Sequence, residues 1–399
     1  MKKLLLVAVS SLGLLGSCKK DPVEPKVETV LVGTLTESKT LTADKEWTLK
    51  GYVYVPEGIT LIIEPGTVIK SDIAEKGALC IERGGKIMAE GTQDKPIVFT
   101  SGQTSPAPGD WGGIIILGKA TTNRTTEPTI EGGIGRPYGG NDDADNSGVL
   151  KYIRVEYAGI AAFPGSEINA FTFGAVGSGT TVEYLESYYG NDDAFEFFGG
   201  TVNPKYLIAV GTADDDYDFD FGYRGTIQYA ISKRDPQFVD GADAGNGIEC
   251  DNDGTGSTAT PTTHPTLINF TLVGPATSNA AANHNLAMRW RRASQFTVIN
   301  SIFFGYVKGG LSLESDETAQ AFKDGVSIFS NNYVSAVDTT KLCVSKSPVI
   351  ASTEMPSIAR TSVFSTSQVA PFDNWLQSYD NRGAIPAGTV NWTLGWSKL

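Results

Sequence analysis

The sequence predicts an all-β fold, a solenoid whose coils each take about 22 residues. Two internal alignments support this prediction: residues 185–190 align with residues 207–212, and residues 192–197 align with residues 214–219. The offset is the same throughout, so the apolar and acidic positions repeat together. Short alternating strands with Gly, Asn and Asp between them form a unit that buries its apolar side only when coils stack.

The composition fits a folded chain with a large core. The 399 residues are 40% hydrophobic and 19% charged, with 45 Gly, which excludes a disordered polymer. The formal net charge of −13 argues against a nucleic-acid partner, because phosphate binding needs clustered Lys and Arg. An acidic surface of this kind suits cations instead.

The N-terminus predicts a membrane address. Residues 1–17 are predicted to be a signal peptide, because two lysines precede an apolar run too short to span a bilayer. The run ends Leu-Gly-Ser-Cys, which resembles the lipobox of bacterial lipoproteins and implies that Cys18 carries the lipid. Residues 18–29 are the tether. We expect a lipid-anchored protein of the outer membrane, in the periplasmic or extracellular leaflet; an ordinary secretory peptide is the alternative.

Strands of the β-helix are expected over residues 30–345, and residues 52–101 show no convincing helix. Apolar residues alternate from residue 52 to residue 69 across Pro-Gly and Glu-Gly turns, which is typical of short strands. Stretches rich in Thr, Gly, Pro and Asp predict loops at residues 121–147, 235–246 and 255–264. Further strands are expected at residues 79–81, 85–92, 96–101, 150–157, 226–231, 266–273, 286–291, 296–303, 310–313 and 326–329.

Several short motifs resemble a known family. They are VPEG at 55–58, EPGT at 64–67, AEGT at 89–92, PIVFTS at 96–101 and DWGGI at 110–114. They are similar to right-handed parallel β-helix proteins of the pectate-lyase-like group. More narrowly, they resemble a largely uncharacterised family of outer-membrane lipoproteins from Bacteroidetes and spirochaetes. The resemblance implies a single-stranded right-handed parallel β-helix over nearly all of the mature chain.

A C-terminal cap is expected over residues 346–399. The strand pattern fades near Cys343, and an open terminal coil would expose strand edges and core. Trp375, Trp392 and Trp396 are therefore expected to cover the last coil. The three other cysteines, Cys80, Cys250 and Cys343, are odd in number and far apart, so no disulfide framework is expected and Cys80 and Cys250 are predicted core residues.

Strand alternation predicts a column of charged side chains. Side chains on a strand point to alternate sides, so Glu196, Asp218, Glu249 and Arg289 should share one outward column. Neighbouring rungs lie about 4.7–4.9 Å apart, so stacked carboxylates repel one another unless something neutralises them. The inward positions are predicted to be Phe195, Phe197, Tyr217, Phe219, Ile248, Cys250, Met288 and Trp290.

Two interpretations of this acidic column stay open. The first is a Ca²⁺ site, because Ca²⁺ takes six to eight oxygen ligands at variable spacing. Its candidate ligands are Asp192, Glu196, Asp214, Asp215, Asp218, Asp220 and Glu249. The second is that Arg289, Arg291 and Arg292 neutralise Glu249 and Asp251 while solvent covers the other acids. The acid-rich loop at residues 141–146 is a further, weaker cation candidate.

The sequence leaves three functions open. The first is a binding protein that presents the acidic, Ca²⁺-loaded face to a glycan or an outer-membrane partner. The second is a polysaccharide lyase, implied by resemblance to pectate lyases, with Arg289 as base beside Asp218 and Glu249, or a glycoside hydrolase using paired carboxylates on the same face. The third, suggested by the family, is an accessory lipoprotein of a TonB-dependent transporter. The aromatic residues Trp111, Tyr188, Tyr189, Phe198 and Tyr223 are read either as ligand platforms or as core.

Overall fold

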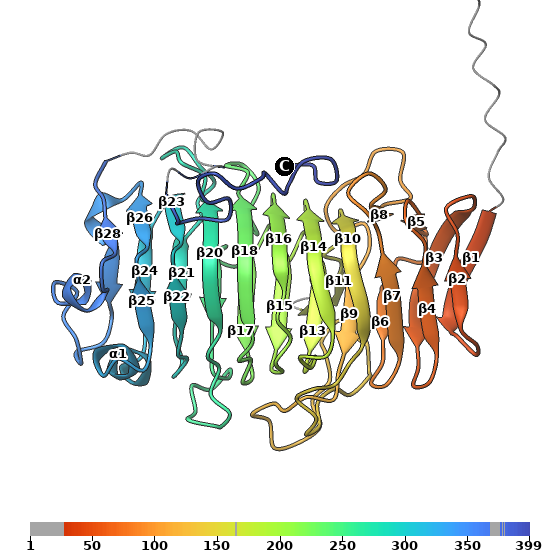
Figure 1. The fold of residues 1–399 in the computed structure, drawn as a ribbon, viewed down its shortest axis with the longest axis horizontal. Helices are drawn as coiled ribbons and strands as arrows, with labels where there is room; N and C mark the ends of the chain where they lie inside the picture. Colours follow the sequence, from red (N-terminus) through yellow and green to blue (C-terminus); the bar gives the residue numbers. More distant parts are fainter. Residues whose placement is uncertain (1–27, 164–165, 368–375, 377, 379) are drawn as a thin grey trace, which may run out of the picture.

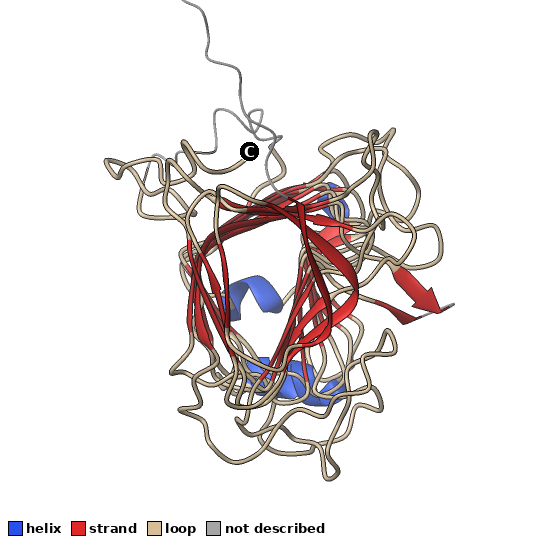
Figure 2. Ribbon diagram, turned by 90° about the vertical axis from the view of Figure 1, so that its right-hand side faces the viewer, coloured by secondary structure: helices blue, strands red, loops and turns tan. Residues whose placement is uncertain are grey.

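The computed structural model describes residues 28–163, 166–367, 376, 378 and 380–399, which stack as a parallel β-helix (Figure 1). The predicted signal peptide, Cys18 and Trp375 lie outside these residues. Viewed along the stack, the strands enclose a central core on three sides (Figure 2). The predicted all-β, right-handed parallel β-helix is confirmed.

Each coil contributes to three stacks of parallel strands, which we call the first, second and third faces. Short strands of the first face are β2 (Lys39–Leu41), β4 (Thr60–Ile63), β7 (Lys86–Glu90), β22 (Thr297–Ile299) and β25 (Ile328–Ser330). Short strands of the second face are β5 (Val68–Ser71), β8 (Ile97–Thr100), β23 (Ile302–Tyr306), β26 (Tyr333–Ala336) and β28 (Val363–Phe364).

Longer strands bend from one face into the next. Those that join the first and second faces are β10 (Gly148–Glu156), β14 (Thr181–Tyr188), β16 (Lys205–Val210), β18 (Thr226–Lys233) and β20 (Thr266–Val273). Those that join the second and third faces are β1 (Glu28–Thr34) and β3 (Glu46–Val55). The hairpin β11 (Ala161–Phe163) and β12 (Ser166–Glu167) is antiparallel and stands outside the stack.

The third face carries the predicted acidic column. Its strands are β6 (Leu79–Ile81), β9 (Ile114–Leu117), β13 (Phe171–Gly174), β15 (Phe195–Phe198), β17 (Tyr217–Asp220), β19 (Ile248–Cys250), β21 (Leu286–Trp290), β24 (Gly309–Leu313) and β27 (Cys343–Ser345). The gaps between β9 and β10, β18 and β19, and β19 and β20 contain the three predicted loops, which are therefore confirmed.

The core behind the third face is a stack of aromatic rings. Phe171, Phe195 and Tyr217 lie in consecutive coils with ring centroids 5.1 and 5.5 Å apart, and their planes are nearly parallel. Burial of such rings drives the coils together, because each removes a large apolar area from water. All eight predicted inward residues have zero exposure, so this prediction is confirmed. Cys80 and Cys250 are also buried and free, as expected.

Two short helices occur near the end of the stack, outside the stretch of residues 52–101 in which no helix is expected. Helix α1 (Asp316–Lys323) begins where the Ser315 side chain accepts a hydrogen bond from the backbone N–H of Thr318, with two acids in its first turn. The turn η1 (Thr339–Lys341) and helix α2 (Met355–Ile358) follow. Met355, Ala359 and Ile350 are buried and close the end of the core. No helix in the described part of the chain is long and apolar enough to cross a membrane.

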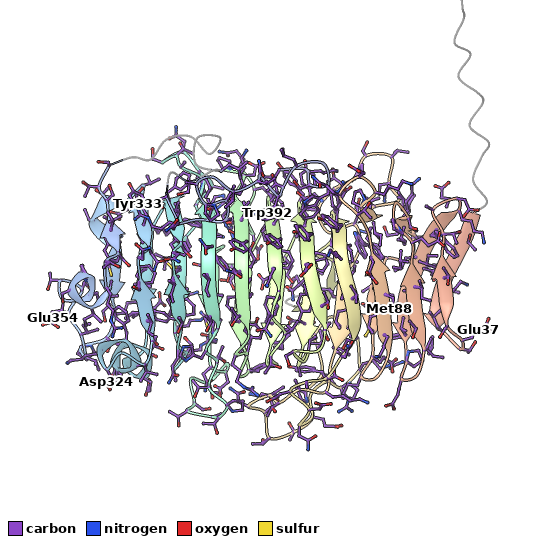
Figure 3. The ribbon with its side chains drawn as sticks, in the orientation of Figure 1. Glu37, Met88, Asp324, Tyr333, Glu354 and Trp392 are labelled. Carbon is purple, nitrogen blue, oxygen red and sulfur yellow. The ribbon has the colours of Figure 1, made fainter. Side chains whose placement is uncertain are left out.

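The C-terminal segment does not cover the last coil. Residues 380–399 run back along the outside of the stack, and the C-terminus lies over its middle (Figure 1). Gln93 donates a hydrogen bond to the Leu394 carbonyl at 2.8 Å, and Arg154 donates one to the Trp396 carbonyl at 2.7 Å. The expectation that Trp392 and Trp396 cover the terminal coil is therefore wrong. Their rings find apolar partners on tyrosines of the middle coils instead, and Trp392 lies over those strands (Figure 3).

Candidate metal centre on the third face

Strand register builds one column of polar side chains on the third face. Glu196 pairs with Asp218 in the next coil, Asp218 pairs with Glu249, and Glu249 pairs with Arg289. Thr172 precedes this row and Ser312 follows it. Parallel pairing in register therefore places the charged side chains in the order that strand alternation predicts.

Arginines neutralise one end of the column. Nη1 of Arg289 lies 2.9 Å from a Glu249 oxygen, and Arg291 also pairs with Glu249. Asp251 lies 2.8 Å from Nε of Arg291 and 2.6 Å from Nη1 of Arg292. Because each of these two carboxylates meets two guanidinium groups, this end of the column needs no further cation.

The other end of the column is a group of carboxylates. The carboxylates of Asp192, Asp193 and Asp214 form one group, and those of Asp193, Glu196 and Asp218 form a second. Within each group one oxygen per residue lies within 4.8 Å of the others, and Asp193 belongs to both. Within residues 28–163 and 166–367, none of these five carboxylates makes an ion pair with Lys or Arg. We call these five residues the acidic cluster.

Hydrogen bonds orient the carboxylates of the acidic cluster. Asp193 accepts a bond from the backbone N–H of Asp215 at 2.8 Å, and the buried amide of Asn169 donates to Glu196. Asp218 accepts from the backbone N–H of Phe219 at 2.6 Å. Each of these three carboxylates is thus fixed through one oxygen, which reduces the entropy lost when a ligand binds.

Burial and mutual repulsion disfavour ionisation of the acidic cluster. Burial raises the pKa of Asp193, Glu196 and Asp218 well above the ordinary range, and neighbouring carboxylates raise it further. Burial and the charge of Asp243 raise the pKa of Asp214 to about 7. A divalent cation among these oxygens would lower the pKa values of the carboxyl groups, because its positive charge favours the ionised carboxylates. The set is all oxygen, which fits Ca²⁺.

The structure sorts the seven predicted ligands into two sets. It brings Asp192, Glu196, Asp214 and Asp218 into the acidic cluster. The three others have separate partners: Glu249 pairs with arginines, Asp215 accepts from the Asn246 backbone, and Asp220 accepts from the Phe221 backbone.

Asp193 is the shared residue of the acidic cluster, although it is not among the seven predicted ligands. The available signal was the Asp-Asp pair at 192–193, which recurs at 214–215. In the acid-rich loop at residues 141–146, by contrast, carboxylates bond to neighbouring segments of the protein and hold the loop in place. Asp143 binds Thr121 and Arg224, and Asp145 accepts from the Lys119 backbone.

The five aromatic residues considered as ligand platforms fall into two sets. Trp111, Phe198 and Tyr223 are at most 8% exposed and belong to the hydrophobic core. Tyr188 and Tyr189 are half-buried and line a surface hollow beside Lys398. The core interpretation is therefore confirmed for the first three.

The coils and the column together define a parallel β-helix protein with a partly uncompensated acidic face. Comparison with protein families identifies the family of this chain. A family described as the pectate-lyase-like β-helix domain matches residues 33–397, so the chain belongs to this family. Searches of curated proteins and of solved structures found no match. The resemblance to the pectate-lyase-like group is confirmed at this level, and the narrower lipoprotein family stays a prediction.

Proposed function

We propose that the protein is a lipid-anchored binding protein of the cell envelope, whose acidic face holds Ca²⁺ and binds a glycan or an outer-membrane partner. The observation that carries the proposal is the acidic cluster, five carboxylates on one face that form no ion pair with Lys or Arg in the part of the chain that the structure describes. Membership of the pectate-lyase-like β-helix family supports a carbohydrate-related role, although a shared fold alone does not determine activity.

The surroundings of Arg289 favour binding over catalysis. Arg289 contacts Glu249 at 2.9 Å and Glu314 at 3.3 Å. Burial would lower its pKa, but the charges of these carboxylates outweigh burial and the net shift is upward. A general base must instead release its proton near the working pH. A lyase or hydrolase that uses Arg289, Asp218 and Glu249 is therefore the second candidate.

One experiment separates the two candidates. The purified protein is incubated with a panel of acidic polysaccharides in Ca²⁺ or in chelator, and both binding and new unsaturated or reducing ends are measured. We expect Ca²⁺-dependent binding without new chain ends, and weaker binding by Asp218→Asn. Turnover that disappears in Arg289→Ala would establish the enzyme instead, and binding that ignores both chelator and Asp218→Asn would contradict a Ca²⁺-loaded face.

The anchor is tested separately, because residue 18 lies outside the described residues. The proposal rests on the signal peptide and the Leu-Gly-Ser-Cys motif. Cys18→Ala should move the protein from the membrane fraction to the soluble fraction, whereas Cys343→Ala should not. Membrane retention of Cys18→Ala would refute the anchor and leave the acidic face unaffected.

A further inference from the structure

A groove lies outside the stack, away from the acidic cluster. It has a volume of about 360 Å³ and runs between the bend that joins the first and second faces and the returning C-terminal segment. This volume lies within the range of small-molecule sites. The acidic column projects from the third face, so the two features are on different sides of the coil.

One wall of the groove is a row of four tyrosines. Tyr152, Tyr184, Tyr206 and Tyr229 occupy the bend of β10, β14, β16 and β18, one in each successive coil. Their ring centroids lie 4.2, 4.4 and 5.1 Å apart, and neighbouring planes differ by about 10°. We call these four residues the tyrosine row.

The tyrosine row occupies a strained backbone position. The four residues have φ between +50° and +63°, in the left-handed region. The same bend in the next three coils holds Asn269, Asn300 and Asn331, at φ of +60°, +56° and +55°. Asn tolerates this conformation, whereas a bulky side chain there is an outlier. At this bend, the coils along the groove therefore carry tyrosine where the next three coils carry asparagine, which is less strained at positive φ. Backbone strain of this kind clusters at ligand-binding sites.

The lining of the groove is aromatic and uncharged. Trp392 and Pro386 form the opposite wall, and Gln93 and Asn391 supply amide groups. Among the described residues, no charged side chain lines the groove, although the whole chain carries a formal charge of −13. At its edge, Lys151 lies 5.9 Å from the centre of the Tyr184 ring, but it is already paired with Glu183 at 3.1 Å. A sugar fits this lining, since its C–H groups pack on aromatic rings and its hydroxyls bond to amides and phenols.

We propose that the groove between the tyrosine row and the C-terminal segment binds an uncharged oligosaccharide. This site goes beyond the proposed function, because it lies on another side of the coil and needs no cation. Trp392 and Trp396 also meet three of the tyrosines edge-on. The alternative is therefore that the tyrosine row serves only to hold the C-terminal segment and binds no ligand. The experiment must exclude this alternative.

The test uses Tyr229, the member of the row next to the Asn-containing coils. Its ring stacks on Tyr206, and Trp392 makes its ring contacts with Tyr184 and Tyr206 instead. Tyr229→Asn places at this bend the residue that the next coil already has, so the fold should persist. Tyr157→Asn is the matched control, because Tyr157 also has a left-handed φ, +61°, and lies outside the groove.

Binding is measured by isothermal titration calorimetry of the purified protein. The ligands are neutral glucan, xylan and mannan oligosaccharides, each titrated in chelator and in Ca²⁺. We expect at least one to bind equally in both buffers, about tenfold more weakly to Tyr229→Asn, and unchanged to Tyr157→Asn. Failure of all neutral sugars to bind, or equal affinity of Tyr229→Asn and wild type, would overturn the proposal. Failure of the neutral sugars together with chelator-sensitive binding of the acidic polysaccharides would overturn this site while supporting the acidic face.

Discussion

At the scale of single residues, one buried ion pair lies behind the acidic cluster. Arg234 is 3% exposed and Asp216 is 1% exposed, with Nε and Oδ2 3.3 Å apart. Arg234 also donates to the backbone carbonyls of Asp214 and Asn246, so it ties the coil of the cluster to the next one. Sequence alone did not indicate this pair, because Arg234 lies just after a strand, where alternation no longer predicts direction.

Removal of Arg234 should therefore destabilise the protein strongly. Arg234→Met leaves the Asp216 carboxylate buried without its cation, which typically costs about 3–5 kcal/mol. Lys70→Met is the control, because the Lys70–Glu46 pair is more than two-fifths exposed on both sides and should contribute about 1 kcal/mol or less. Urea denaturation of both variants measures the difference. Equal stability of the two variants would show that the buried pair contributes no more than a surface pair.

A second buried carboxylate makes stability depend on pH. Glu186 has zero exposure and accepts bonds at 2.8 and 3.0 Å from the Lys398 backbone N–H, while burial raises its pKa to about 8. The unfolded pKa is about 4.3. Between these values the folded state keeps a proton that the unfolded state has released, so stability should fall as pH rises from about 4.3 to about 8.

Glu186→Gln should remove this part of the pH dependence. The variant should match wild type near pH 4 and be more stable near pH 8, with slopes that differ by up to about 1.4 kcal/mol per pH unit. Urea denaturation at four pH values in chelator measures both slopes, and the contributions of all other groups cancel in the comparison. Parallel slopes would contradict a protonated Glu186 in the folded state.

At the scale of elements, the C-terminal segment acts as a strap on the middle coils. Trp392 and Trp396 make four edge-on contacts with three tyrosines, at centroid distances between 5.2 and 6.3 Å. Each such pair contributes about 0.5–1.5 kcal/mol. The segment adds no strand to the stack, so its stabilisation comes from side chains and from hydrogen bonds such as those with Gln93, Arg154 and Glu186.

Deletion of residues 390–399 should lower the free energy of unfolding by about 2–6 kcal/mol, because the four aromatic contacts are lost together. Val390→Ser is the control, since Val390 is 86% exposed and its replacement should change stability by no more than about 0.5 kcal/mol. Differential scanning calorimetry measures both. A deletion variant as stable as wild type would show that the segment rests on the coils without stabilising them.

Alternation predicted the strands but not the bends or the strap. The rule that side chains alternate correctly placed Phe195, Glu196 and Asp218, because a residue in a regular strand has only two possible directions. It could not place Asp193, which lies before β15, or Tyr206, whose φ is positive. It also could not place Trp396, which meets Arg154 across 242 residues of sequence. No local period encodes such a contact.

At the scale of the whole molecule, charge compensation changes along the axis of the stack. Arginines on β21 and the loop after it neutralise Glu249 and Asp251, whereas the acidic cluster beside β15 and β17 has no ion-pair partner among the described residues. In a solenoid each coil contacts only its neighbours, so unrelieved repulsion in the middle weakens the contact between the two halves. A bound cation would therefore stabilise the whole stack.

Thermal unfolding with and without Ca²⁺ tests this central claim most directly. Binding to the native state alone stabilises it by about 2.7 kcal/mol at a hundredfold excess over Kd, a few degrees in Tm for a chain of this length. The rise should be larger at pH 8 than at pH 5, because the raised pKa values keep the ligands protonated in acid. Asp193→Asn should abolish it, and Asp324→Asn, an exposed acid outside the cluster (Figure 3), should not. Identical melting of wild type and Asp193→Asn with and without Ca²⁺ would contradict the cation site.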